Sequence, residues 1–280
     1  MILFKKAIPL SQHLDTAQKS GQQIGFVPTM GALHEGHLAL LQACRAQCDI
    51  VVCSIFVNPT QFNNPMDYKL YPNTIDKDLE LLAAAGCDVL FLPAKEEMYP
   101  DGYVAKHYDL GAIETILEGQ YRPGHFQGVC QAVDRLLQIV APQQVYFGQK
   151  DYQQCMVVKR LLTLIHRENI MLNIIPTRRE KSGLALSSRN LRLTPEQRQK
   201  AVAIYKTLTF LKAHIAQESV ANLKTESIAQ LLQAGFKVDY VAIADAETLG
   251  PVAEVNGRKI VGLVAATLGD VRLIDNMQLN

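Results

Sequence analysis

The chain has 280 residues, of which 48% are hydrophobic, so it can bury a large core in one domain or, as we expect, in two. Its 28 basic and 27 acidic residues give a formal net charge of +1, which excludes attraction to nucleic acid or an anionic membrane through a global field. The N-terminal residues lack the long apolar region of a secretory signal, and the longest apolar stretches have only the length of a strand. We therefore expect a cytoplasmic protein with no membrane span.

From residue 24 to about 175, short apolar runs rich in β-branched residues alternate with amphipathic segments of helical length. Strands are predicted at 24–27, 50–57, 89–92, 144–147 and 171–175. Helices are predicted at 36–47, 75–85, 127–140 and 152–166. This α/β pattern is typical of a Rossmann-like, doubly wound parallel sheet, in which ligands bind beyond the carboxyl ends of the strands.

The stretch PTRREKSGLALSSRN (176–190) is polar and basic, and it reads as a hinge or an active-site loop. Thr194 then begins a new helix as an N-cap, with Gln197 placed to complete a capping box. Further on, strands are predicted at 237–243, 260–266 and 271–274. We expect two domains, a Rossmann-like one over 1–176 and a smaller C-terminal α+β one over 177–280.

The six cysteines are scattered and include no CxxC pair, so free buried thiols are expected. Cys44 and Cys48 would share a helix face at i,i+4, but no second pair with zinc-like spacing accompanies them. No metal-ligating residues are predicted.

The first strand runs directly into PTMGALHEGH (28–37), after which a helix begins. Unpaired backbone N–H groups and the helix dipole favour a phosphate at such a position, and Gly31 and Gly36 let the backbone approach it. His34 and His37 can donate hydrogen bonds to phosphoryl oxygens. Two alternatives stay open. The histidines could cap the helix, or they could bind zinc. The helical two-histidine zinc motif needs i,i+4 spacing, however, and these histidines are at i,i+3 across a glycine.

The spacing His34, Gly36, His37 resembles the HxGH signature of the nucleotidyltransferase superfamily. The longer string PTMGALHEGHLAL is more specific and resembles the pantothenate synthetase family. Further matches to that family cover most of residues 24–195, at VNPTQF (57–62), YRPGHF (121–126), GQKDYQQ (148–154) and LSSRN (186–190).

The resemblance implies an ATP site formed by Met30, Gly31, His34, Gly36, His37, Gly148, Lys150, Asp151, Arg178, Leu186, Ser187, Ser188 and Arg189. Among these, it implies catalytic roles for His34, His37, Lys150 and Arg189. Without the other motifs, the Lys150–Asp151 pair would be interpreted as a solvated charged turn. Residues 187–189 resemble the loop that closes on the triphosphate.

For pantoate and β-alanine, the resemblance implies Asn58, Gln61, His125 and Gln154. Neutral amides just past a strand can hydrogen-bond hydroxyl and carboxylate groups. Two positions depart from the family pattern: Leu186 replaces a common methionine, and Arg178 stands where a small aliphatic residue is expected, so only its main chain carries over. Asp76 and Asp78 read as helix-dipole partners rather than magnesium ligands, and neither is assigned to the site.

The implied reaction is the ATP-dependent condensation of (R)-pantoate with β-alanine through pantoyl adenylate, giving pantothenate, AMP and pyrophosphate. It implies Mg²⁺ with the ATP, a homodimer, and no nucleic-acid or membrane partner. Two rivals remain: an enzyme of the superfamily that stops after nucleotide transfer, and a regulatory protein that binds nucleotide without turnover.

Overall fold

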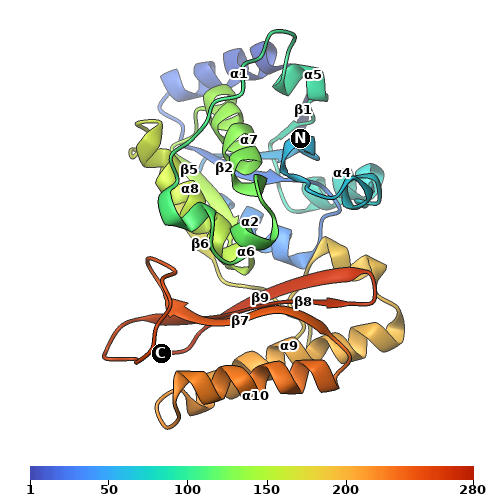
Figure 1. Ribbon diagram of the computed structural model, residues 1–280. Coiled ribbons are helices and arrows are strands. Elements are labelled where there is room, and N and C mark those ends of the chain that lie inside the picture. The colour runs from blue at the N-terminus through green and yellow to red at the C-terminus, as the bar shows by residue number, and fades with distance from the viewer.

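The computed structural model describes residues 1–280 and contains a six-stranded parallel sheet in the order β1-β4-β3-β2-β5-β6 (Figure 1). Its strands are β1 (Ile2–Phe4), β2 (Ile24–Thr29), β3 (Ile50–Ile55), β4 (Val89–Phe91), β5 (Gln144–Gly148) and β6 (Met171–Ile175). The order reverses at β2, where β3 lies on one side and β5 on the other. In doubly wound folds, such a reversal opens a crevice at the carboxyl ends of the strands.

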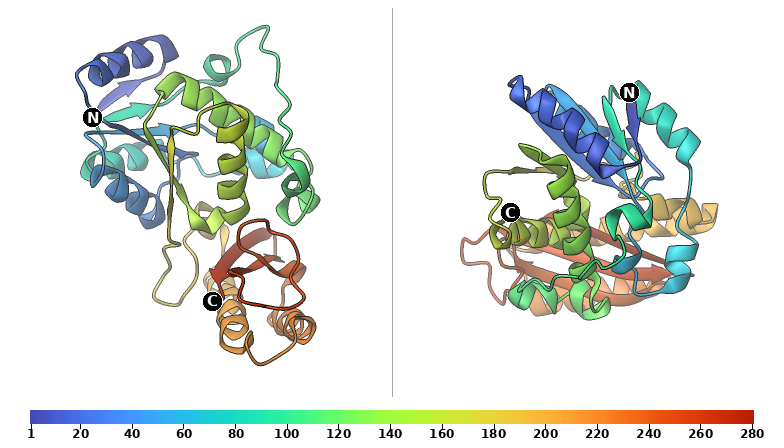
Figure 2. Two further views of the ribbon diagram at one scale, coloured as in Figure 1. Left: turned by 90° about the vertical axis from the view of Figure 1, so that its left-hand side faces the viewer. Right: turned by 90° about the horizontal axis from the view of Figure 1, so that it is seen from above.

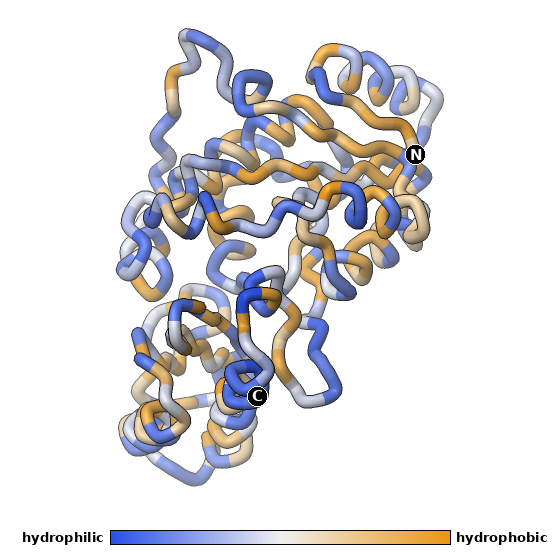
Figure 3. Tube along the Cα trace, turned by 90° about the vertical axis from the view of Figure 1, so that its right-hand side faces the viewer, coloured by the Kyte–Doolittle hydropathy of each residue, from blue (hydrophilic) through white to orange (hydrophobic).

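Helices cover both faces of this sheet, as the alternation of its strand residues requires. Phe26 and Val52 pack with α1 (Ala7–Lys19), α7 (His125–Val140) and α8 (Tyr152–Leu164). On the other face, Val27 and Cys53 pack with α2 (Glu35–Arg45) and α4 (Ile75–Ala84). The strands are apolar along most of their length while the connections are largely hydrophilic (Figure 3). Three short helices lie in the connections, α3 (Pro65–Lys69), α5 (Lys95–Met98) and α6 (Glu118–Tyr121).

The C-terminal region forms an antiparallel sheet of β7 (Lys237–Asp245), β8 (Ile260–Leu268) and β9 (Val271–Gln278). Its outer face packs against α9 (Pro195–His214) and α10 (Val220–Gln233) in a separate core. Its inner face turns toward the first sheet (Figures 1 and 2), where Val261 and Leu263 pack with Tyr152 of α8. The two sheets therefore meet near the carboxyl ends of β5 and β6.

The predicted fold class is confirmed, and the predicted strands and helices differ from the observed ones by only a few residues at their ends. The capping box of Thr194 and Gln197 is present at the start of α9. All six cysteines are free and buried, as expected. None of the helices is both long enough and apolar enough to cross a bilayer.

Two elements near the N-terminus were missed. The spacing of Leu10, Leu14 and Ala17, which are the buried face of α1, is a helical signal that could have revealed it. By contrast, β1 has only three residues, and it is a strand because Ile2 and Phe4 pair with Val89 and Phe91 of β4. Such an edge strand depends on a partner that is distant in sequence.

Candidate active site

A cavity of about 230 Å³ lies where the two sheets meet, beyond the carboxyl ends of β2, β5 and β6. A second cavity of about 630 Å³ shares walls with it on the side of α3 and β9. The first cavity is lined by all but one of the predicted site residues: Met30, His34, Gly36, His37, Asn58, Gln61, His125, Gly148, Lys150, Asp151, Gln154, Arg178, Leu186, Ser187, Ser188 and Arg189. The exception is Gly31, which forms a turn with φ of +78° behind the cavity wall.

Both histidines cap helix α2 and also face the cavity. The Gly36 N–H donates to His34 Nδ1 at 3.1 Å, and the His34 N–H donates to His37 Nδ1 at 3.4 Å. A neutral imidazole that accepts at Nδ1 carries its proton on Nε2. The capping geometry therefore leaves each ring one Nε2–H donor for a ligand, so capping and ligand binding do not exclude each other. Zinc is not favoured, because no group of three or more His, Cys, Asp or Glu side chains is arranged for a metal ion.

The surroundings keep both rings neutral at pH 7. Burial, reinforced by the charge of Lys150, lowers the pKa of His34 from 6.5 to about 4. Burial, with smaller contributions from His34 and Lys150, also lowers the pKa of His37 well below its usual value. The rings thus offer oriented N–H dipoles, and the positive charge at this end of the cavity comes from Lys150 and Arg189.

The lowered pKa of His34 predicts how stability depends on pH. Below pH 6.5 the unfolded chain protonates this histidine, whereas the folded protein keeps it neutral down to about pH 4, so stability falls as pH decreases through that window. Urea unfolding should show that the free energy of unfolding decreases less between pH 7 and pH 5 for His34→Asn than for the wild type. Asparagine keeps the N-cap but does not titrate. An equal loss in both proteins would contradict this assignment.

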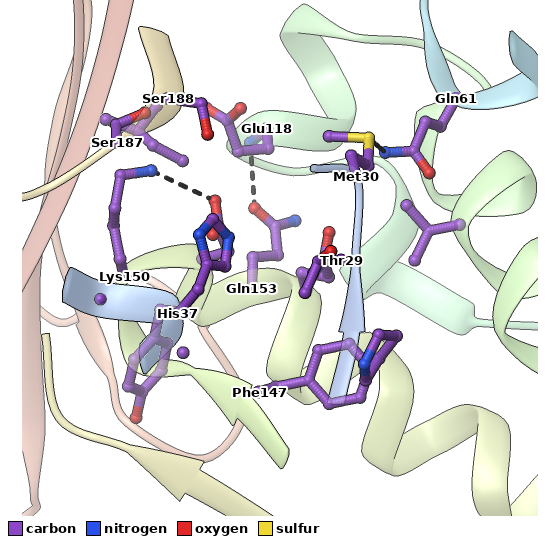
Figure 4. A pocket seen from close by; sticks show the side chains of 18 of the residues that line it. Thr29, Met30, His37, Gln61, Glu118, Phe147, Lys150, Gln153, Ser187 and Ser188 are labelled. Carbon is purple, nitrogen blue, oxygen red and sulfur yellow. Dashed lines mark hydrogen bonds and ion pairs between the residues drawn. The ribbon is translucent and has the colours of Figure 1, made fainter. Parts of the chain in front are cut away.

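The loop between the sheets brings its own donors to the same end of the cavity. The Ser188 hydroxyl donates to the Ala32 carbonyl at 3.0 Å, which ties this loop to the turn before α2. Arg189 and Arg192 both pair with Asp67 of α3, at 2.8 and 2.9 Å. A phosphate entering here would compete with Asp67 for Arg189. The ammonium group of Lys150 pairs only with Asp151, at 3.4 Å, and points toward His37 and Ser187 (Figure 4).

The opposite end of the cavity is built around Gln61 (Figure 4). Its Nε2 lies 3.0 Å from Met30 Sδ, and its Oε1 accepts from Asn58 Nδ2 at 3.0 Å. Asn58 is buried and also bonds to Gly128, Tyr99 and Thr60, so it holds Gln61 in place. Gly128 in α7 is needed there, since a Cβ would come within 2.3 Å of the Thr60 carbonyl oxygen.

His125 also supports this end rather than carrying charge. Its Nδ1 donates to the Gln61 carbonyl at 2.7 Å, and its Nε2 accepts from Arg122 at 3.1 Å. Burial and the adjacent Arg122 lower the pKa of His125 to about 3, so it is neutral. Gln154 faces the cavity from α8, with no hydrogen bond to another side chain.

Sequence reasoning missed three residues that shape the site. Asp76 and Asp78 both lie in the first turn of α4, as dipole partners should, but Asp78 is also buried and bonded to the turn before His34, which the sequence did not predict. Gln153 accepts from the Glu118 N–H at 3.0 Å. Glu118 accepts hydrogen bonds from Arg272, which lies 154 residues later in the chain. No local sequence pattern predicts that contact.

Comparison with known proteins agrees with this arrangement. The family model for pantoate-beta-alanine ligase matches residues 3–278. Among curated proteins, the chain is 44% identical to the pantothenate synthetase of Moorella thermoacetica, over 100% of this chain and 99% of that protein. It is 46% identical to the pantothenate synthetase of Pseudomonas putida, over 94% and 92% of the two chains.

Solved structures give the same result. The crystal structure of pantothenate synthetase from Thermus thermophilus superposes with a TM-score of 0.93 at 42% identity, covering 100% of this chain and 99% of that one. The pantoate-beta-alanine ligase of Francisella tularensis, complexed with beta-gamma ATP and beta-alanine, superposes with a TM-score of 0.84 at 38% identity, covering 100% and 98%. From its architecture, its cavity and these full-length similarities, the chain belongs to the pantoate–β-alanine ligase family and is a ligase that forms an amide bond.

Proposed function

We propose that the chain condenses (R)-pantoate with β-alanine in a reaction driven by ATP, through an enzyme-held pantoyl adenylate, and releases pantothenate, AMP and pyrophosphate. One observation carries this proposal: a single cavity joins phosphate-binding groups at one end to a neutral amide pocket at the other. The Francisella relative complexed with beta-gamma ATP and beta-alanine supports the choice of these two substrates.

The chemistry requires activation because a carboxylate is a poor electrophile. Attack of the pantoate carboxylate on the α-phosphorus of ATP releases pyrophosphate and gives the acid a good leaving group. The β-alanine amine then attacks the carbonyl carbon, and AMP departs. The enzyme mainly has to position the reactants and stabilise charge on phosphorus.

In this proposal, His34 and His37 donate from Nε2 to phosphate oxygens, while Lys150 and Arg189 supply positive charge. The Ser187 hydroxyl also donates, and Ser188 holds the loop in the ATP site through its bond to the Ala32 carbonyl. His34, His37 and Lys150 are already in place, so they stabilise charge in the transition state without reorganisation, whereas Arg189 must first exchange Asp67 for phosphate. Met30, Gly36, Gly148, Asp151, Arg178 and Leu186 complete the ATP site, with Arg178 acting through its main chain. Gln61 and Gln154 bind pantoate, with Asn58 and His125 supporting Gln61.

We propose that Mg²⁺ arrives with ATP, bound mainly by phosphate oxygens and water as is usual for this ion. The nearby carboxylates are suited to a smaller contribution to magnesium binding than the phosphate oxygens. Glu118 is bound to Arg272 and Asp275 to Arg179, whereas Asp151 has only its 3.4 Å contact with Lys150. Asp151 is thus the lining carboxylate best able to face a magnesium–phosphate complex, where the cation would offset phosphate charge.

Residues 177–280 are proposed to act as a lid over residues 1–176, which shelters the reactive adenylate from water. Family resemblance favours a homodimer in the cytoplasm, and the net charge of +1 favours neither nucleic acid nor membrane as a partner. Sedimentation of the purified protein would test the dimer.

The decisive experiment is ATP–pyrophosphate isotope exchange with magnesium, measured with and without pantoate and without β-alanine. Exchange that depends on pantoate is expected, and its absence in a folded, ATP-binding protein would overturn the proposal in favour of a regulatory role or another acid. Addition of β-alanine should then release AMP in step with a new amide. An enzyme that stops after nucleotide transfer would show no product that depends on the amine.

A further inference from the structure

The turn before helix α2 has a backbone that its own sequence does not favour. Gly31 and Ala32 both have positive φ, +78° and +50°, and alanine adopts that left-handed region at a cost. His34, the N-cap of α2, follows two residues later. Unless contacts from outside the turn hold it, the direction in which His34 and His37 enter the cavity is not defined.

Asp78 supplies those contacts from the first turn of α4. Its Oδ2 accepts from the Ala32 N–H and its Oδ1 from the Leu33 N–H, both at 2.8 Å. The Thr74 hydroxyl donates to the same Oδ1 at 3.1 Å. The Asp78 side chain is only 1% exposed, so these charge-assisted bonds are not weakened by water. The space is also tight, because a Cβ on Gly31 would lie 3.1 Å from Asp78 Oδ2.

Ala32 is therefore held on both sides. Its N–H is bonded to Asp78, and its carbonyl accepts from the hydroxyl of Ser188, in the loop between the two sheets. One residue thus connects α4, the turn before the two histidines, and the loop that carries Arg189. Protein donors engage both Asp78 oxygens and occupy three of the roughly four lone-pair positions of the carboxylate, so most of its acceptor capacity is used within the protein.

We propose that Asp78 is a positioning residue for nucleotide activation: it fixes the 31–33 turn so that His34, His37 and the Ser188 loop face the phosphates together. This inference rests on the proposed function. It predicts an effect on ATP and on the adenylation step, and none on pantoate recognition at Gln61, which lies at the other end of the cavity.

The test is Asp78→Asn, which keeps the volume but replaces one acceptor by a donor facing a backbone N–H. Misplacing catalytic groups by about 1 Å costs on the order of 100-fold. We expect kcat for pantoate-dependent exchange to fall about 10- to 100-fold and the KM for ATP to rise, with the KM for pantoate unchanged. Calorimetric titration should also show weaker ATP binding, a readout that needs no turnover.

Asp134→Asn is the matched control. Asp134 is a buried carboxylate of α7 that accepts from the Tyr108 hydroxyl at 2.8 Å and from Gln138 at 2.9 Å, and it does not line the cavity. Its loss should lower stability without changing the KM for ATP. If Asp78→Asn loses stability but keeps the wild-type kcat and ATP affinity, the inference is overturned.

If Asp78→Asn does not fold, Thr74→Val provides a less disruptive test of the same inference. It removes only the hydroxyl that donates a hydrogen bond to the Asp78 carboxylate. One hydrogen bond predicts a rise of about two- to tenfold in the KM for ATP, and an unchanged value overturns the inference. Failure of the proposed function looks different: the wild type itself would then lack pantoate-dependent exchange, while the loss of ATP affinity in Asp78→Asn could still be measured.

Discussion

Replacing His37 by alanine should lower pantoate-dependent ATP–pyrophosphate exchange by about 10²–10³-fold, the usual effect of removing one donor that stabilises a transition state. The ring is neutral and carries its proton on Nε2, so alanine removes a directed donor rather than a charge. Alanine removes the long 3.4 Å bond that His37 contributes to the capping box, but it favours helix and leaves the N-cap residue His34 in place, so the protein should still fold.

The steady-state exchange rate at saturating ATP and pantoate measures this effect, and circular dichroism verifies the fold. His107→Ala is the control, because His107 is exposed and lies outside the site cavity. Turnover near the wild-type rate in His37→Ala would remove this histidine from the catalytic groups. A loss of the same size in both variants would mean that the assay reports general damage.

Replacing Glu118 by alanine should lower the free energy of unfolding by about 3–5 kcal/mol, the range seen when one partner of a buried ion pair is removed. Glu118 in α6 is 6% exposed and receives two bonds from Arg272 of β9, at 2.7 and 2.8 Å, and one from Tyr240 of β7, at 2.9 Å. Burial alone would raise the pKa of Glu118, but Arg272 and Arg122 outweigh it and lower that pKa. The substitution would leave both arginines largely buried without this partner.

Urea denaturation at pH 7 measures the loss. Glu196→Ala is the control, since Glu196 is an exposed residue of α9 paired only with Lys200, and no measurable change is expected there. Because Glu118 joins the first sheet region to the C-terminal sheet, its variant should also unfold in two separate steps. A single transition at the wild-type midpoint would contradict the role of Glu118 in joining them.

Parallel βαβ units could be predicted because each strand and each crossover helix carries its own periodicity in the sequence. The polar blocks after β2, β3 and β5 converge for a general reason: the carboxyl ends of parallel strands share one edge of the sheet. The 176/177 domain boundary and the chemical role of each residue in the ligand-bound enzyme stay predictions. The pairing of β1 with β4 could not be predicted from the sequence, because a strand of three residues is too short to show a periodic hydrophobic pattern.

The sequence by itself determined the fold class, the family and many of the residues that face the cavity, because these follow from local patterns and from motifs in a fixed order. Only the tertiary structure decided how those residues behave. Burial makes His34 and His125 neutral, Asp67 holds Arg189, and Asp78 fixes the turn before the histidines. Burial and long-range pairing depend on which distant segments pack together, and no local window of sequence contains that information.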